Sequence, residues 1–160
     1  MKESLKSLVI TISFVIGAST GYAESGVESL SPELRSLLSK EMLAIQDGMT
    51  SIFPAYISGN LNEVANIAHK IKNSYILKQS ITQVQKHELK TKLPKAFLQS
   101  DQKFHQYAGM LVHVAEERNF ELVGFYYSKL AESCVSCHSQ YGLHKFSDFE
   151  VKTIHKDDLH

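Results

Sequence analysis

The sequence has no surplus of basic residues, no internal repeat and no segment in which apolar and polar residues alternate as they do in a strand. Lysine and arginine together number 17, and aspartate and glutamate also number 17. Nucleic-acid-binding domains carry a clustered excess of lysine and arginine, so we expect no nucleic-acid partner. Without strand-like alternation, the sequence favours a helical fold.

Long apolar runs are also scarce, and the main one is at the N-terminus, over residues 8–17. It follows Lys2 and Lys6 and is too short to span a bilayer comfortably. Gly21 and Ala23 place small residues at the two positions that a signal peptidase reads. We therefore predict a cleavable signal peptide, with an uncleaved N-terminal anchor as the alternative.

Cleavage after Ala23 makes residues 1–23 the signal peptide and residues 24–160 the mature chain. That length suits one domain, with a core at about residues 31–142. No second apolar stretch is long enough for a membrane span. We expect a soluble periplasmic protein if the source is a Gram-negative bacterium.

Cysteine occurs only twice, as Cys134 and Cys137, and His138 follows at once. A disulfide is the first interpretation for an exported chain, but it would close a very small loop and restrict the unfolded chain little. A thioredoxin-like site would need a preceding strand, and none is predicted. A zinc site would need two further ligands, and the other histidines are scattered.

The string CxxCH has a specific chemical use. Two thiols one helical turn apart form thioethers to the two vinyl groups of a haem, and the adjacent histidine reaches the iron. Covalent attachment requires export, which the predicted signal peptide supplies independently. The sequence therefore predicts one haem c, bound through Cys134 and Cys137, with His138 as an iron ligand.

Helical patterns fill the mature chain. Ser31 and Pro32 form a helix start, and Gly59 is expected to follow that helix's end. Asn60 resembles the cap of a second helix, and Pro94 opens a third. The seam positions of the four helices recur mostly at spacings of three and four. They are Leu38, Met42, Ile45, Met49, Ile52 and Tyr56; Val64, Ile67, Ala68, Ile71 and Tyr75; Phe97, Asp101, Phe104, Ala108, Leu111 and Ala115; Val123, Tyr127, Leu130, Cys134 and Cys137.

Two connections complete the predicted fold. Residues 117–119 form a tight turn before a fourth helix that stops near Tyr141, before Gly142. Residues 77–93 are polar and form a long connection with room for one short helix. We predict an all-α, up-down-up-down four-helix bundle with the haem near the C-terminal helix.

Small residues on the fourth helix suggest where a haem fits. Gly124, Ala131 and His138 recur every seven residues on one stripe, leaving space beside the helix in line with the histidine. Ordinary close packing of small residues is the alternative interpretation. After the helix, Phe146 and Phe149 are expected to fold back on the bundle.

The signal peptide, the four helices and the CVSCH string (Cys134 to His138) followed by Tyr141 resemble the class II c-type cytochromes, the cytochrome c′ family and its low-spin relatives. The resemblance covers essentially the whole mature chain. It implies that His138 is the proximal ligand and that the first helix supplies the residue on the other side of the iron. Family members commonly have an arginine directly after that tyrosine; here it is Gly142.

The sixth ligand is open. By resemblance to the low-spin members, Met42 is the first choice, and a thioether ligand would suit an electron carrier. Core packing of this methionine, ligation by Met49, no protein ligand, and ligation by His105 are alternatives; a His105 bonded to Asp101 would be merely structural. Arg35 and Lys145 are candidate partners of the haem propionates.

The expected function is that of a periplasmic monohaem one-electron carrier with an unidentified redox partner, and not that of an enzyme. The alternative is a five-coordinate haem protein that binds nitric oxide or carbon monoxide. A homodimer formed through an exposed helix face is compatible with the sequence.

Overall fold

The computed structural model describes residues 26–149, and these residues are all-α, as predicted. They form six α-helices and contain no strand: α1 (Pro32–Ile57), α2 (Leu61–Asn73), α3 (Leu77–Ser80), α4 (Gln83–Lys92), α5 (Lys95–Glu116) and α6 (Phe120–Tyr141), with short 3-10 turns at Val27–Ser29 and Ser147–Phe149. The predicted signal peptide and the tail from residue 150 lie outside the described residues.

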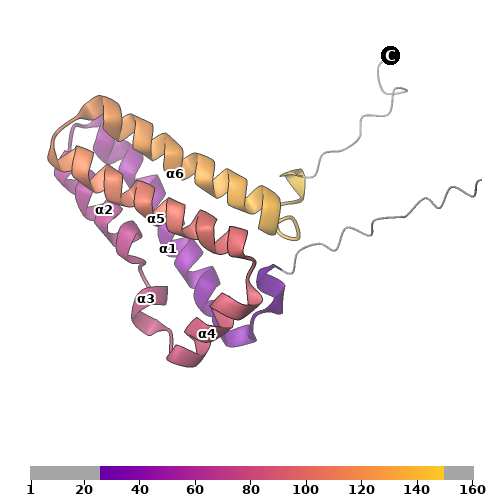
Figure 1. Ribbon diagram of the computed structural model, residues 1–160. Coiled ribbons are helices and arrows are strands. Elements are labelled where there is room, and N and C mark those ends of the chain that lie inside the picture. Colours follow the sequence, from indigo (N-terminus) through magenta and orange to yellow (C-terminus); the bar gives the residue numbers. More distant parts are fainter. Residues whose placement is uncertain (1–25, 150–160) are drawn as a thin grey trace, which may run out of the picture.

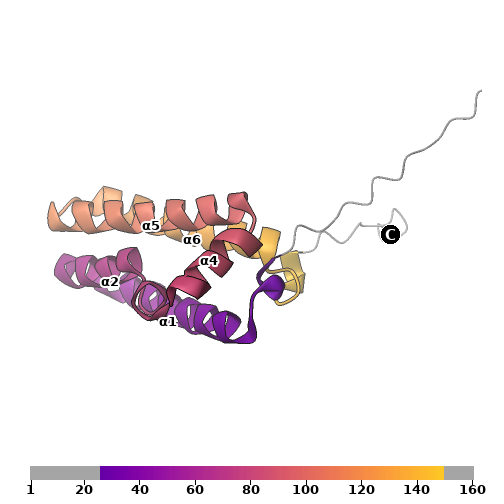
Figure 2. The ribbon, with the colours of Figure 1, turned by 60° about the horizontal axis from the view of Figure 1, so that its bottom comes forward.

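The four long helices pack as a bundle in two layers, with α1 beside α2 and α5 beside α6 (Figures 1 and 2). The largest helix–helix interface is between α2 and α5. The smallest interface between adjacent long helices is between α1 and α6. The main core joins all four helices, and its fully buried large side chains are Ile52, Leu61, Val64, Ile71, Leu111, Val123 and Leu130. Their three- and four-residue spacing places them on the inner stripe of each helix.

The helix ends follow local sequence signals. Gly59 follows α1 with a φ of 75°, and Arg118 turns the chain between α5 and α6 with a φ of 58°. The side chain of Asn60 caps α2 by accepting a hydrogen bond from the backbone N–H of Glu63. Ser31 is the N-cap residue of α1, but its side chain does not cap the helix, because it donates to Glu88 instead.

The connection between α2 and α5 contains two helices, α3 and α4, where the sequence analysis allowed for one. A capping box between Thr82 and Gln85 begins α4. A second apolar cluster, distinct from the main core, anchors this region; it contains Leu30, Leu34 and Leu93, with Leu77, Ile81, Leu89 and Phe97 packed against it. Both helices therefore cover the starts of α1 and α5.

A buried carboxylate joins the same region to α1. Glu41 is 1 % exposed. Its two oxygens accept hydrogen bonds from the Ser74 hydroxyl and from the backbone N–H groups of Tyr75, Ile76 and Leu77, at 2.6–3.1 Å. The turn between α2 and α3 is thus held by one side chain of α1.

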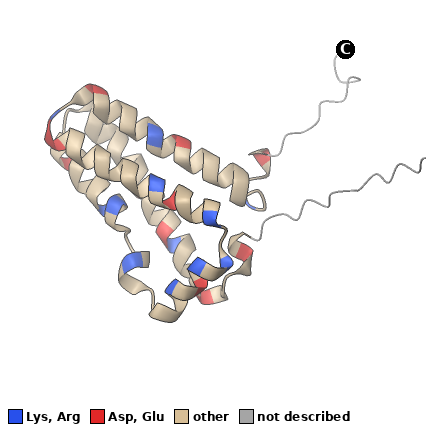
Figure 3. Ribbon diagram, viewed as in Figure 1, with Lys and Arg blue, Asp and Glu red and all other residues tan. Residues whose placement is uncertain are grey.

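Charge is unevenly distributed over the bundle (Figure 3). Eight exposed lysines and only two acidic residues lie between residues 70 and 103, whereas Glu116, Glu117 and Glu121 surround the turn between α5 and α6. The even total charge therefore conceals a basic side, formed by the end of α2, by α3 and α4, and by the first half of α5. None of the helices among residues 26–149 is both long and apolar enough to cross a membrane.

Candidate functional site

The CVSCH string occupies the last two turns of α6. Cys134 and Cys137 are free thiols, and they and His138 are partly buried. Burial raises the pKa of Cys134; burial, the Asp101 carboxylate and Cys134 together raise the pKa of Cys137 to about 11. Burial also lowers the pKa of His138 from its ordinary value, so the imidazole is neutral at pH 7 and its nitrogen lone pair is free to bind a metal.

Three contacts define which face of α6 is turned toward α1. The Tyr56 hydroxyl donates to the Phe120 carbonyl at 2.9 Å, and the Tyr127 hydroxyl donates to the Met49 carbonyl at 3.4 Å. The rings of Phe53 and Tyr127 lie 6.5 Å apart. Residues late in α1 thus meet residues early in α6, so the two helices run in opposite directions.

Helical spacing is expected to bring His138 and Met42 to the same level of this pair of helices. Tyr127 and His138 are about three helical turns apart on α6 and share a stripe with Cys134. Phe53 and Met42 are about three turns apart on α1, in the opposite direction along the bundle. Continuing the register of the Phe53–Tyr127 contact therefore brings Met42 level with His138, on the facing stripe.

The side chain of Met42 lies at the edge of the α1 seam. The buried positions of α1 are Leu34, Glu41, Ile45, Gly48, Ile52 and Ala55, whereas Met42 is 41 % exposed. Ile45 and Ile52 are therefore buried as predicted. At the previous turn the buried residue is Glu41 instead of the predicted Met42. Met49, by contrast, packs against the main core, so Met42 is the freer of the two candidate methionines.

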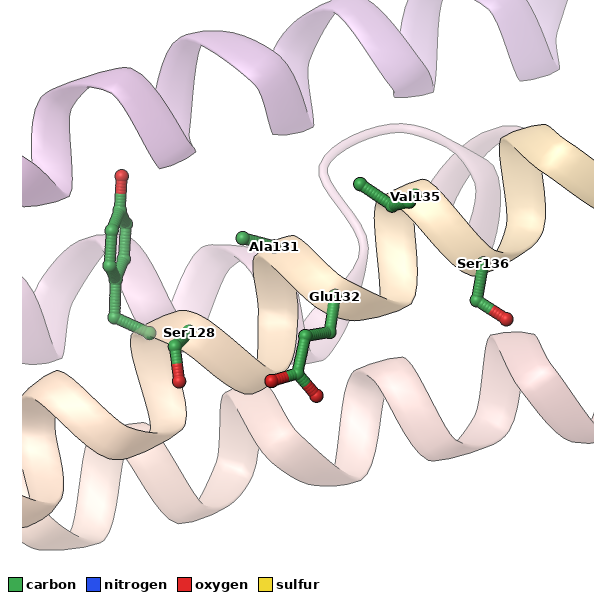
Figure 4. A pocket seen from close by; sticks show the side chains of 6 residues that line it. Ser128, Ala131, Glu132, Val135 and Ser136 are labelled. Atoms are coloured by element: carbon green, nitrogen blue, oxygen red, sulfur yellow. The ribbon is translucent and has the colours of Figure 1, made fainter. Parts of the chain in front are cut away.

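A shallow apolar hollow of about 540 Å³ runs along α6 from Tyr127 to Val135 and Ser136 of the CVSCH string. Figure 4 shows its lining residues Ala131 and Val135 on the side of α6 that looks toward α1, with Ser128, Glu132 and Ser136 turned away. Val135 is 52 % exposed. From the three contacts onward, α1 and α6 diverge toward the C-terminal end of α6 (Figures 1 and 2).

The predicted stripe of small residues has two different roles along α6. A Cβ atom on Gly124 would lie 2.9 Å from the Tyr56 hydroxyl, so this glycine allows α1 and α6 to approach closely. Ala131, two turns later, lines the hollow instead. Close packing against Tyr56 therefore explains Gly124, whereas Ala131 borders the hollow.

His105 of α5 is engaged by α2 and by its own helix. Its Nδ1 lies 2.8 Å from the carbonyl oxygen of Ile71, on α2, and its Nε2 lies 3.6 Å from the Asp101 carboxylate. Both ring nitrogens therefore have partners. This arrangement agrees with the structural interpretation of His105 rather than with ligation.

The candidate propionate partners lie near the CVSCH end of the bundle without contacting it. The Arg35 Nη1 donates to the backbone carbonyl of Glu28 at 3.4 Å, and Lys145 is exposed after the end of α6. The Glu28 carboxylate lies 2.6 Å from His144 Nδ1. This contact was not predicted, since no local pattern connects residues so far apart in the chain.

Phe146 was predicted to fold back on the bundle, but the residue that it contacts was not predicted. Its ring stacks on the His138 imidazole, with centroids 4.1 Å apart and planes at 11°. The signal for this contact is the glycine that ends α6, because the lack of a side chain at Gly142 leaves room for the Phe146 ring.

The residues around the CVSCH string fit a haem. Val135, Met42 and Phe146 are exposed apolar side chains beside or level with the string, and a flat apolar group would cover such surface. Among residues 26–149 no three His, Cys, Asp or Glu side chains gather to hold a metal ion. A haem makes no such demand, because the porphyrin supplies four nitrogen ligands and the protein only axial ones.

Comparisons of the chain with protein-family models, with curated protein sequences and with solved structures found no match. Only the site itself therefore bears on the function of this chain.

Proposed function

We propose that the chain is an exported, periplasmic monohaem c-type cytochrome that carries single electrons, built as an up-down-up-down bundle. The observation that carries the proposal is the position of Cys134 and His138 on the same stripe of α6 as Tyr127, which contacts α1. A cleavable signal peptide over residues 1–23 would supply the export that covalent attachment requires.

Each residue of the string has a distinct role in this proposal. The thiols of Cys134 and Cys137, one turn apart on α6, would hold the haem through two thioethers. The neutral His138 imidazole would bind the iron on the proximal side. When bound, the haem supplies a metal centre that gains and loses one electron.

Met42 is the proposed second axial ligand. Helical spacing puts it level with His138 on the neighbouring helix, and its thioether is exposed and flexible. A thioether ligand favours ferrous iron and raises the reduction potential. Keeping the same two ligands in both oxidation states suits electron transfer.

The test begins with the purified exported protein. We expect haem that stays with the polypeptide after denaturation, a ferric spectrum with a methionine–iron charge-transfer band, and no binding of carbon monoxide by the ferrous protein. Loss of the haem on denaturation would reject the proposal. Ready binding of carbon monoxide, with no charge-transfer band, would instead establish the gas-binding alternative.

Two methionine variants identify the ligand. Met42→Ala should lose the charge-transfer band and open the iron to carbon monoxide. Met110→Ala on α5 is the matched control, because Met110 is also 41 % exposed but lies on a helix that does not carry the facing stripe. If Met42→Ala keeps the wild-type spectrum, the assignment of Met42 is wrong.

A further inference from the structure

The chain turns back sharply after α6 and covers one face of the proximal histidine. The Gly142 N–H donates to the His138 carbonyl, and the N–H groups of Lys145 and Phe146 both donate to the Gly142 carbonyl, at 2.8 and 3.0 Å. This tight turn places the Phe146 ring on the His138 imidazole. The two ring planes are nearly parallel, and their centroids are 4.1 Å apart.

Gly142 makes this close return of the chain feasible. A Cβ atom at this position would lie 3.0 Å from the Phe146 ring and 3.0 Å from the His138 carbonyl oxygen. Both neighbours belong to the stacked pair. A Cβ atom at this position would therefore crowd the stacked pair and require a shift of a few tenths of an ångström.

The returning segment is also held from its other side. His144, two residues before Phe146, pairs with Glu28 in the segment that precedes α1. The Glu28 carbonyl in turn accepts a hydrogen bond from Arg35 of α1. The loop over residues 142–146 is therefore attached to the bundle at both α6 and α1.

We propose that Phe146 is a positioning residue that sets the orientation of the proximal imidazole plane. A stacked ring restrains rotation of the imidazole about its Cβ–Cγ bond, and the favourable contact is lost if the imidazole turns. The nitrogen lone pairs lie in the imidazole plane, so a ring stacked on its face leaves them free to reach iron. Partners that orient a metal-binding histidine tune the metal as well as the ligand.

This inference rests on the proposed haem attachment, and its test separates the two. Covalent haem is first measured by mass and by absorbance after denaturation in the wild type and in every variant. The haem-methyl hyperfine shifts and the ferric electron paramagnetic resonance spectrum are then recorded, because both respond to the orientation of the axial imidazole plane.

Phe146→Leu removes the stacking ring and keeps an apolar side chain, so it should change the pattern of hyperfine shifts. Phe146→Tyr, which keeps an aromatic ring, should restore the wild-type pattern. Phe149→Leu is the matched control, since Phe149 belongs to the same segment and is 38 % exposed against 39 % for Phe146. It should leave the pattern unchanged.

Gly142→Ala provides a second route if Phe146→Leu does not accumulate, because it displaces the ring without removing it. It should alter the hyperfine pattern in the same sense. If the haem is attached and either variant that accumulates gives the wild-type pattern, the role of Phe146 is refuted while the proposed function stands. If the wild type holds no covalent haem, both are refuted.

Discussion

The hydroxyl of Tyr56, in the last turn of α1, donates a 2.9 Å hydrogen bond to the carbonyl oxygen of Phe120, the first residue of α6. The first-turn carbonyl at Phe120 thereby gains a partner on a helix far away in sequence. Together with the contacts of Tyr127, this bond sets the register between α1 and α6, from which the relative level of Met42 and His138 follows. A register set at one end of the pair thus governs the geometry at the other.

Replacing Tyr56 by phenylalanine removes only the hydroxyl. We expect Tyr56→Phe to lower the free energy of unfolding by about 1 kcal/mol, the net value of one hydrogen bond. Denaturant titration followed by circular dichroism measures the change. Tyr107→Phe on α5 is the control. It should lower the free energy of unfolding less, because within residues 26–149 the Tyr107 hydroxyl forms no hydrogen bond to the main chain of another helix. Equal effects of the two changes would contradict the role given to Tyr56.

Glu41 should be among the most sensitive positions of the chain. Glu41→Ala leaves three backbone N–H groups and the Ser74 hydroxyl without their acceptor, and we expect a loss of about 3 kcal/mol or more. Glu41→Gln should also destabilise, since its amide NH₂ group would face N–H donors. Exposed Glu33 of α1 is the control, and Glu33→Ala should change stability by under about 0.5 kcal/mol. Thermal unfolding of the three variants tests this.

Glu88 should make stability depend on pH in the acid range. The hydrogen bond from Lys92, followed by that from the Ser31 backbone, lowers the pKa of Glu88 below its ordinary value. A group whose pKa is lowered by folding stabilises the fold fully above its unfolded pKa, and that contribution disappears as the pH falls through the folded pKa. Glu88→Gln should therefore show a smaller loss of stability than the wild type between about pH 6 and pH 3.

Urea midpoints across that pH range measure the effect of Glu88. Glu116→Gln removes a carboxylate from the exposed end of α5 and serves as the control. It should follow the wild-type dependence more closely than Glu88→Gln. Parallel curves for Glu88→Gln and the wild type would show that the link from α4 to the start of α1 is not maintained by this carboxylate.

Two helical glycines should respond oppositely to alanine. At Gly48 of α1, a Cβ atom would collide with the Tyr75 hydroxyl and lie 3.3 Å from Ile67, so Gly48→Ala should destabilise by about 1–3 kcal/mol. At Gly109 of α5 the nearest atoms are carbons of Lys72 at 3.6 Å, an ordinary contact. Gly109→Ala should therefore stabilise, by up to about 1 kcal/mol from helix propensity. Melting temperatures of the two variants give the signs.

Local signals were enough to predict most of the helices. The Ser31–Pro32 start, the Asn60 cap and the apolar spacing of α2 and α6 each act within one or two turns, and each corresponds to an observed helix. The capping box of Thr82 and Gln85 was a signal of the same kind. It would have revealed α4 despite the polar sequence around it.

The contacts that could not be predicted join residues distant in the chain. Apolar spacing alone cannot decide which face of α1 is innermost, because Glu41 is buried by donors from a turn more than 30 residues away, while Met42 beside it is left at the edge. The pairing of Glu28 with His144 spans almost the whole described chain. For the site, the CVSCH string was visible at once, but the Phe146 ring over His138 required the path of the returning loop.

The buried Glu41 should also slow hydrogen exchange in the turn between α2 and α3. The N–H groups of Tyr75 and Ile76 precede α3 and belong to a turn, where backbone amides ordinarily exchange their hydrogens with water rapidly. Here a carboxylate of α1 accepts from both of them. Their exchange requires α1 and the turn to separate. Slow hydrogen exchange should therefore appear in a segment without helical hydrogen bonding.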